Sequence, residues 1–378
     1  MKYYVIAGEA SGDLHGSNLI KEIIKLDSNA IIRAWGGDKM KNAGATIIKH
    51  FKELSFMGFY EVFMNLKTIL KNIDFCKYDI KQFNPDKIIF IDYPGFNLRI
   101  AKWAKTNNFN TNYYIAPQIW AWNEKRIKNI KASIDNLYVI LPFEKEYFEK
   151  KHGFKVKFLG HPLLDSIDNF KNHRKIDFYL DNKLDNKKEI ISILPGSRKQ
   201  EIKKILGVML KVIDHFPKYQ FIIAGAPNID LDFYKKIIRY KNVRVIKAKT
   251  YELLTNSKAA LVTSGTATLE TAIFKIPQVV CYKTSFISYI LAKIFVKIKF
   301  ISLVNLIMQK EIIKELIQSD CTKYNIVKEL KKVLDLKKRK ELSNKYDNLI
   351  SLLGSSGSSK RVAEDIVLKN INFENRRN

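Results

Sequence analysis

Short apolar runs recur along the 378-residue chain, and segments with helical periodicity separate them. Each run is almost continuously apolar, which is typical of strands buried on both faces of a sheet. The runs in the first half are residues 2–8, 30–37, 86–92, 111–117, 136–142 and 155–162. Because helical segments alternate with these strands, the pattern predicts a parallel α/β sheet covered on both sides.

A polar and charged stretch, Asp165–Glu189, interrupts this alternation and is the best candidate for a linker. The pattern then starts again, with apolar runs at residues 190–198, 219–227, 242–249, 259–266 and 277–284. A chain of this length is also long enough for two cores. We therefore expect two doubly wound domains, 1–168 and 169–353, followed by a C-terminal helix and tail, 354–378, that pack back on the first domain.

Two further apolar segments do not fit the strand pattern. Residues 286–301 place apolar side chains on one helical face and Lys293 and Lys297 on the other. Such a helix either lies on an anionic membrane surface or packs on its own domain. The Phe- and Met-rich segment 56–66 either lines a groove for acyl chains or belongs to the core. Neither a bilayer-spanning helix nor a signal peptide is expected.

The chain is strongly basic, with 66 Lys and Arg against 38 Asp and Glu and a formal net charge of +28. This charge suits nucleic acid, an anionic membrane surface or a phosphate-rich substrate, unless it reflects a general compositional bias. The basic residues are spread along the chain, which argues against a nucleic-acid-binding stripe. The three cysteines are far apart, so we expect neither a disulfide framework nor a zinc site, and a reducing compartment.

The loop after the first run has the sequence GEASGD, Gly8–Asp13. In open parallel sheets, ligands bind at the carboxyl ends of strands, so this loop is a candidate site. It lacks the GxGxxG pattern, and Glu9 and Asp13 would repel a diphosphate. These carboxylates, with Ser11 and Gly12, suit sugar hydroxyls or an amide; the alternative is a capped tight turn.

A second candidate is the sequence IIFIDYPGFN, in which Asp92 ends a buried strand. Burial raises the pKa of a carboxyl group and makes its carboxylate a better base. Asp92 is therefore a candidate to accept the proton of an attacking alcohol. The alternative is a cap for the next helix, but Pro94 and Gly95 intervene, and Asn97 is expected to be the better cap.

Two turns in the second half suit phosphate. In LPGSR, the residues Gly196, Ser197 and Arg198 combine backbone N–H groups at a helix start with a guanidinium. In TSGTATLE, the small residues Ser264, Gly265 and Thr266 leave room for a phosphate against the backbone. The alternative for each is an ordinary strand-to-helix turn. Together they predict a nucleotide site in the second domain.

Glu270 lies about one turn into the helix that follows the second of these turns. Its carboxylate is placed to accept two hydrogen bonds from a ribose diol, and the alternative is a solvated helix face. No metal-binding residues are predicted, because Asp230 and Asp232 do not lie at the tip of a strand.

The motifs, taken in order, resemble those of the lipid-A-disaccharide synthase family. The resemblance spans most of the chain, and the combination of PQIWAW with GEASGD is highly specific. The segments that carry it are AGEASGD, ELSFMGFYEV, IDYPGFN, IAPQIWAW, LPFEKEYF, FLGHPLLD, LPGSR, TSGTATLE and SLVNLI. The resemblance implies a GT-B fold, in which two Rossmann-like domains face each other across the active site.

The resemblance also implies an inverting, metal-independent glycosyltransferase without a cofactor. Its donor would be UDP-2,3-diacylglucosamine and its acceptor 2,3-diacylglucosamine 1-phosphate (lipid X), giving a β-1,6-linked disaccharide 1-phosphate and UDP. The first domain would bind the acceptor and the second the donor. The enzyme would work in the cytoplasm, bound peripherally to anionic lipids at the inner membrane, and not on nucleic acid.

The family motifs map onto individual residues of this chain. Asp92 resembles the base that deprotonates the acceptor 6-hydroxyl, and Gly95 stands where the family often has a second acidic residue. The acceptor side would comprise Glu9, Ser11, Gly12, Asp13 and Asn97. The UDP side would comprise Gly196, Ser197, Arg198, Ser264, Gly265, Thr266, Glu270 and Asn305.

Two other functions fit parts of the pattern. A related GT-B enzyme, such as a peptidoglycan-type transferase or a UDP-GlcNAc 2-epimerase, would share the fold and the UDP site. A nucleic-acid-binding protein would account for the charge but leave the carboxylates at the strand ends unexplained.

Overall fold

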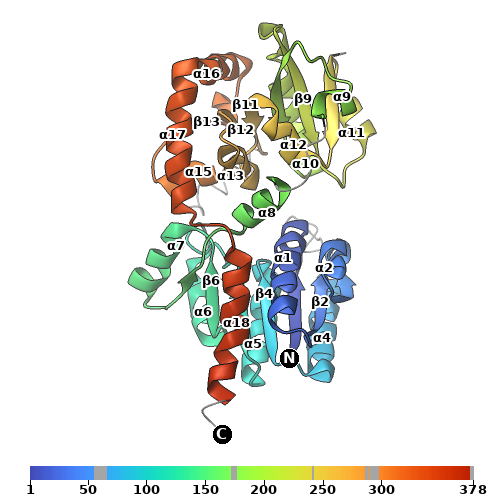
Figure 1. The fold of residues 1–378 in the computed structure, drawn as a ribbon, viewed down its shortest axis with the longest axis vertical. Coiled ribbons are helices and arrows are strands. Elements are labelled where there is room, and N and C mark those ends of the chain that lie inside the picture. Colours follow the sequence, from blue (N-terminus) through green and yellow to red (C-terminus); the bar gives the residue numbers. More distant parts are fainter. Residues whose placement is uncertain (55–65, 172–176, 241, 286–288, 290–297, 375–378) are drawn as a thin grey trace. The chain divides into compact units, whose positions relative to one another are not determined.

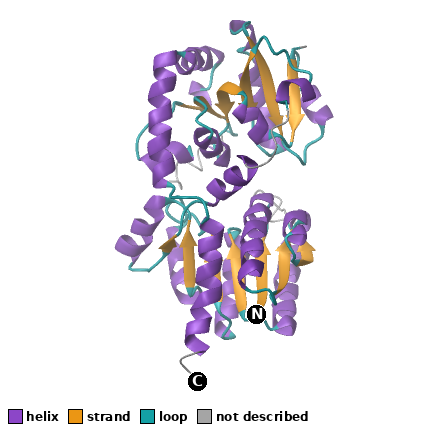
Figure 2. Cartoon of the chain, in the orientation of Figure 1, coloured by secondary structure: helices purple, strands orange, loops and turns teal. Residues whose placement is uncertain are grey.

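The computed structural model describes residues 1–54, 66–171, 177–240, 242–285, 289 and 298–374 (Figure 1). The contacts of the chain divide it into two compact units. The first consists of Met1–Ser166 together with Leu353–Asn378, and the second of Ile167–Leu352. In each unit a sheet is flanked by helices, as the strands and helices of Figure 2 show.

The first unit contains a seven-stranded sheet in the order β3-β2-β1-β4-β5-β6-β7, and every pair of neighbouring strands is parallel. Successive residues of a strand enter cores on opposite faces. On β1, for example, Tyr4 and Ile6 join one core, whereas Tyr3 and Val5 join the other. The strands are β1 (Lys2–Ala7), β2 (Ile31–Gly36), β3 (Thr46–His50), β4 (Lys87–Ile91), β5 (Thr111–Tyr114), β6 (Asn136–Val139) and β7 (Lys157–Phe158).

Helices cover both faces of this sheet. One core contains residues of α4 and α5, and the other contains residues of α1 and α18. The α-helices are α1 (Ala10–Leu26), α2 (Asp38–Asn42), α4 (Leu66–Phe83), α5 (Pro94–Thr106), α6 (Ile127–Ser133), α7 (Pro142–Glu146) and α18 (Ser358–Glu374). Shorter helical segments are η1 (Phe51–Glu53), η2 (Glu124–Arg126) and η3 (Tyr147–Lys151).

The C-terminal helix α18 belongs to the first unit although nearly 190 residues separate it from the rest (Figure 1). Its side chains Val362, Ile366 and Val367 share a core with Ile20 of α1. The carboxylate of Asp165 accepts hydrogen bonds from the backbone N–H groups at the start of the helix, at residues 357, 358 and 359. Burial and capping thus both fix α18 on this sheet.

The second unit contains a six-stranded parallel sheet in the order β10-β9-β8-β11-β12-β13. Its strands are β8 (Glu189–Leu194), β9 (Tyr219–Gly225), β10 (Val243–Lys247), β11 (Ser257–Val262), β12 (Gln278–Tyr282) and β13 (Glu315–Ile317). Its helices are α9 (Phe178–Asp181), α10 (Lys199–Leu210), η4 (Ile213–His215), α11 (Leu231–Lys235), α12 (Thr250–Thr255), α13 (Thr266–Ile273), α15 (Leu303–Met308), η5 (Gln318–Asp320), α16 (Lys323–Leu334) and α17 (Leu336–Leu352). Helix α8 (Pro162–Lys171) spans the boundary between the units.

Each predicted apolar run contains a strand, and the doubly wound parallel architecture is confirmed. The short strands β3 and β13 were not predicted. The Asp165–Glu189 stretch is not a simple linker, because most of α8 and all of α9 lie within it. Most of 286–301 and nearly all of 56–66 lie outside the described residues, and no described helix is long and apolar enough to cross a bilayer.

Candidate active site

Asp92 directly follows β4 and occupies a strained turn. Asp92 and Tyr93 both have left-handed backbone conformations, with φ of 46° and 51°. Such conformations cost about 1–3 kcal/mol each and persist where neighbouring contacts hold them. Here the Asp92 carbonyl accepts hydrogen bonds from the Tyr113 hydroxyl (2.5 Å) and the Asn97 amide (2.7 Å). The turn therefore holds Asp92 at the carboxyl end of the sheet.

The surroundings of Asp92 favour its protonated form. Burial raises the pKa of the carboxyl group to about 6, and the nearby charge of Glu9 adds to the rise. The backbone N–H of Tyr93 acts in the opposite direction. A carboxylate with a pKa close to neutrality is a more effective general base than an ordinary surface aspartate.

Asn97 does not cap the helix, contrary to the prediction. Helix α5 begins earlier, at Pro94, and Asn97 lies fully buried in its first turn. Its side-chain amide donates to the carbonyls of Ile6, Ile91 and Asp92. These contacts tie β1 to the Asp92 turn, so Asn97 supports the turn from within the core.

The GEASGD loop follows β1, the neighbour of β4 in the sheet. Glu9 is half-buried at the start of α1, and Ser11 is exposed. A Cβ atom at Gly8 would come within 2.4 Å of the Tyr93 ring, so the two loops touch. Gly12 packs its helix closely on β1, since a Cβ atom there would lie 2.9 Å from that of Ala7.

Asp13 has a structural role that the sequence did not reveal. Its buried carboxylate accepts hydrogen bonds from the backbone N–H groups of Gly37 (2.8 Å), Lys39 (3.2 Å) and Met40 (3.0 Å). It therefore caps α2, and its predicted contact with a ligand stays a prediction. Of the predicted acceptor-side residues in this loop, Glu9 and Ser11 are the ones with side chains open to solvent.

Three side chains that follow β5 and β6 were missed at the sequence level. The carboxylate of Glu144, fully buried after β6, accepts from the Trp120 indole (2.9 Å) and from the N–H groups of Ile140 and Leu141. Burial raises its pKa to about 7, and the charge of Asp92 adds to the rise. Arg126 ends η2 and interacts electrostatically with Tyr113 of β5. Trp120 and Arg126 follow β5, and Glu144 follows β6. The rule that ligands bind beyond the carboxyl ends of parallel strands, which led to Asp92, would also have found these three residues.

In the second unit, the two phosphate-friendly turns lie side by side. They follow β8 and β11, which are neighbours, and Thr263 N–H donates to the Leu194 carbonyl. Gly196 has φ +109°, and a Cβ atom there would come 3.3 Å from the Thr263 methyl group. Ser197 and Arg198 follow, and the exposed Arg198 guanidinium lies 3.5 Å from Glu201 at the start of α10.

The second turn presents a helix N-terminus without a side-chain cap. Gly265, with φ +141°, precedes α13, and no heavy atom lies within 4 Å of the position of its missing Cβ. Thr266 is exposed beside it. The Ser264 hydroxyl donates to the Ile301 carbonyl (2.7 Å), which holds the turn in place. Open backbone at a helix start suits a phosphate group.

Glu270 and Asn305, both predicted on the UDP side, differ in their surroundings. The Glu270 carboxylate accepts from the Tyr251 hydroxyl (3.0 Å), and burial raises its pKa. Asn305 is fully buried: its amide donates to Ile313 and Glu315, and its oxygen accepts from Ile312 and Ile313. All its donors and acceptors are thus used within the unit, and the predicted contact with UDP is not supported.

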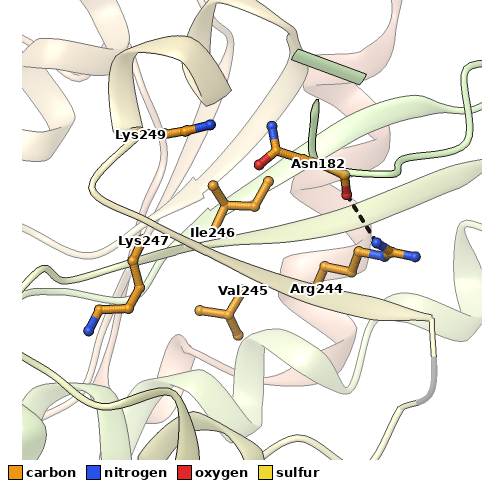
Figure 3. Close-up of a pocket in the computed structure, with 6 residues that line it drawn as sticks. All are labelled: Asn182, Arg244, Val245, Ile246, Lys247 and Lys249. Carbon is orange, nitrogen blue, oxygen red and sulfur yellow. Dashed lines mark hydrogen bonds between the residues drawn. The ribbon is translucent and has the colours of Figure 1, made fainter. Parts of the chain in front are cut away.

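A separate hollow of about 420 Å³ lies along the edge strand β10, whose residues line it (Figure 3). The Arg244 guanidinium donates to the Asn182 carbonyl at one side of it, and Lys247 and Lys249 line it as well. None of the turn residues described above lines this hollow. In the described part of the chain, no group of three His, Cys, Asp or Glu residues is placed to hold a metal ion.

Comparisons with known proteins give a consistent result. Residues 3–367 match the family model described as lipid-A-disaccharide synthetase. The chain is 35% identical over 367 residues to a lipid-A-disaccharide synthase of Syntrophus aciditrophicus, covering 95% of each chain. It is 37% identical over 330 residues to lipid-A-disaccharide synthase 1 of Legionella pneumophila, covering 85% of each.

Solved structures with the same fold are more distant in sequence. A UDP-GlcNAc 2-epimerase from Neisseria meningitidis, bound to UDP-GlcNAc, has a TM-score of 0.63 at 14% identity, covering 98% of this chain and all of that one. The calicheamicin glycosyltransferase CalG4 has a TM-score of 0.60 at 11% identity, covering 96% and 97%. At these identities the likeness shows the fold alone.

Proposed function

The chain belongs to the lipid-A-disaccharide synthase family and is a glycosyltransferase with a GT-B fold, and from this premise we propose how its residues carry out the reaction. The family implies UDP-2,3-diacylglucosamine as donor and lipid X as acceptor. The first unit binds the acceptor and the second binds the donor. We thus assign acceptor binding to Met1–Ser166 with Leu353–Asn378 and donor binding to Ile167–Leu352, bounds that differ by one or two residues from the expected 1–168, 169–353 and 354–378.

Asp92 is the general base. Its carboxylate accepts the proton of the acceptor 6-hydroxyl while that oxygen attacks the anomeric carbon of the donor. The bond to the UDP oxygen breaks with its electron pair, and the configuration inverts to give the β-1,6 linkage. The observation that carries this assignment is the environment of Asp92 at the end of β4. Its backbone carbonyl is held by two hydrogen bonds, and burial raises the pKa of its carboxyl group to about 6.

The second unit binds UDP and stabilises the diphosphate as it leaves. The turns at Gly196–Arg198 and Ser264–Thr266 offer backbone N–H groups at the starts of α10 and α13, and Arg198 adds a positive charge. The Glu270 carboxylate, held by Tyr251, accepts from the ribose diol. This arrangement neutralises the leaving group without a divalent metal ion.

The protein works at the cytoplasmic face of the inner membrane, bound peripherally. Both substrates carry acyl chains, and a net charge of +28 favours a surface rich in anionic lipid. Phosphorylated, acylated substrates and a basic enzyme therefore meet at the same surface.

The activity is tested in detergent by measuring UDP and disaccharide 1-phosphate from UDP-2,3-diacylglucosamine and lipid X, with EDTA present. We expect both products in equal amounts. Loss of product with EDTA, restored by a divalent cation, would contradict metal independence. A further arm supplies UDP-GlcNAc alone, because conversion to its 2-epimer would indicate the epimerase function of the structural relatives instead.

A further inference from the structure

Arg126 is a half-buried cation with no carboxylate partner among the described residues of the first unit. It ends η2, between β5 and α6, and makes no ion pair with a carboxylate among the described residues. The adjacent Glu124 pairs with Lys151 and His152 instead. Arg126 lies over the ring of Trp122, with its guanidinium carbon 4.9 Å from the ring centroid. This stacking holds the guanidinium plane and leaves its N–H groups available at the edges.

Arg126 lies on the segment that follows β5, the neighbour of β4 in the sheet. Asp92 follows β4, Glu9 follows β1 on one side of it, and Arg126 belongs to the segment after β5 on the other. Tyr113, from β5, donates to the Asp92 carbonyl and also interacts electrostatically with Arg126. Burial lowers the pKa of Arg126, and Tyr113 opposes this change. Glu9 therefore lies on the β1 side of the base, and Tyr113 links the Asp92 turn to Arg126 on the β5 side.

The negative charge of Glu9 on the β1 side and the positive charge of Arg126 on the β5 side favour binding of an anion on the β5 side. A phosphate on the β1 side would be repelled by Glu9, whose charge already raises the pKa of Asp92. On the β5 side it would meet a guanidinium that is partly desolvated and has the geometry for two parallel hydrogen bonds to a phosphate. Pairing would also remove the penalty of leaving a half-buried charge unneutralised.

We propose that Arg126 binds the phosphate monoester of the acceptor and makes the enzyme specific for a phosphorylated acceptor sugar. The inference rests on the proposed function, because lipid X carries its reacting hydroxyl and its phosphate on one sugar ring. A base at the end of β4 and a phosphate receptor after β5 match that arrangement. Trp122, 48% exposed, sets the orientation of the guanidinium as a positioning residue.

The test compares kcat/KM for lipid X and for its dephosphorylated form in wild type and Arg126→Ala. We expect wild type to prefer the phosphorylated acceptor. Loss of a charged, bidentate contact should reduce kcat/KM for lipid X by about 10- to 100-fold, mainly through KM, and leave the dephosphorylated acceptor nearly unaffected. Arg126→Gln, which keeps part of the stem against Trp122, should also lose the preference. Lys128→Ala, a change of an exposed cation on α6, serves as the matched control.

Several outcomes would overturn the proposal. Equal losses with both acceptors would indicate a structural role, and a wild type without preference for the phosphorylated acceptor would remove the reason for the site. The same phosphate chemistry occurs in lipid headgroups. If Arg126→Ala weakened binding to phosphatidylglycerol vesicles but kept the acceptor preference, Arg126 would contact the membrane instead. Failure of the proposed function is distinct, because wild type would then form no disaccharide from either acceptor.

Discussion

At the residue scale, the position of Asp92 is fixed by contacts to its backbone and to the residue that follows it. Tyr113 and Asn97 donate hydrogen bonds to its carbonyl, and Gly8 packs against the ring of the next residue, Tyr93. The sequence alone predicted Asp92 because an apolar strand ends at it. It did not predict the parts played by Asp13, Asn97 and Asn305, because the same side chains that bind ligands also bind backbone groups. Their backbone partners are distant in sequence and become visible only in the fold.

The raised pKa of Asp92 gives the reaction a predictable pH dependence. A general base must be deprotonated, so log(kcat/KM) should rise with a slope near one below pH 6 and level off above it. Glu9→Gln removes a charge that raises this pKa and should move the acid limb to lower pH. Glu22→Gln, on the same helix, is the control. An acid limb that does not move in Glu9→Gln would contradict the electrostatic account.

His15 and His161 make the stability of the first unit sensitive to acid. Among the described atoms, His15 Nδ1 and His161 Nε2 are buried without a hydrogen-bond partner. Burial lowers the pKa of His15 to about 4 and that of His161 to about 3, and the charge of His15 contributes to the latter. The unfolded chain therefore takes up protons near pH 6.5, whereas the folded chain does not, and stability is lost as the pH falls.

We expect each histidine to contribute a loss of up to about 1.4 kcal/mol per pH unit below pH 6.5. His161→Asn keeps an acceptor for the Leu163 N–H and should reduce the loss. The raised pKa values of Asp92 and Glu144 act in the opposite direction, so the comparison is the difference between variant and wild type. Urea unfolding at pH 7 and pH 5 measures it, and identical losses would refute this role for His161.

At the element scale, the apolar runs predicted the long strands because those strands are buried on both faces. The edge strands β3 and β13 escaped prediction because one has few consecutive apolar residues and the other is very short. Thr46–His50 has only one fully non-polar pair of residues, and Glu315–Ile317 is three residues long. The start of α5 was also predicted too late, with Asn97 as its cap. The helix begins at Pro94, directly after Asp92 and Tyr93 with their left-handed backbone conformations. Backbone strain leaves no periodic signal.

Helix α18 completes the core of the first unit, and a core substitution in it should destabilise that unit. Ile366 is buried against residues of α1. Ile366→Ala should lower the free energy of unfolding by about 2–5 kcal/mol, as expected for a large-to-small change in a packed core. Leu368→Ala, at a position 44% exposed on the same helix, should have little effect. Urea denaturation measures both, and equal effects would mean that the burial of α18 does not stabilise the unit.

At the scale of the whole molecule, composition indicates a partner without locating it. The basic residues behind the net charge of +28 are spread over the chain, and only some of the described ones form salt bridges. The two-unit architecture followed from the repeated strand pattern. The segments with the most obvious amphipathic character, 56–66 and 286–301, lie mostly outside the described residues.

If the charge serves membrane binding, association should depend on both lipid and salt. We expect binding to vesicles that contain phosphatidylglycerol to weaken strongly as salt rises from about 0.05 M to 0.5 M, because screening shortens the range of the attraction. Vesicles of phosphatidylcholine alone should bind less at low salt. Co-sedimentation measures both, and equal binding to the two kinds of vesicle would favour compositional bias as the origin of the charge.

The most direct measurement of the central claim is the turnover of Asp92→Asn with UDP-2,3-diacylglucosamine and lipid X. We predict that kcat falls by about 10²- to 10⁴-fold, the usual contribution of a general base, while UDP binding and the melting temperature stay close to wild type. Asp86→Asn, on the residue just before the same strand, is the matched control and should remain active. A folded Asp92→Asn enzyme with turnover near that of wild type would show that another group removes the acceptor proton.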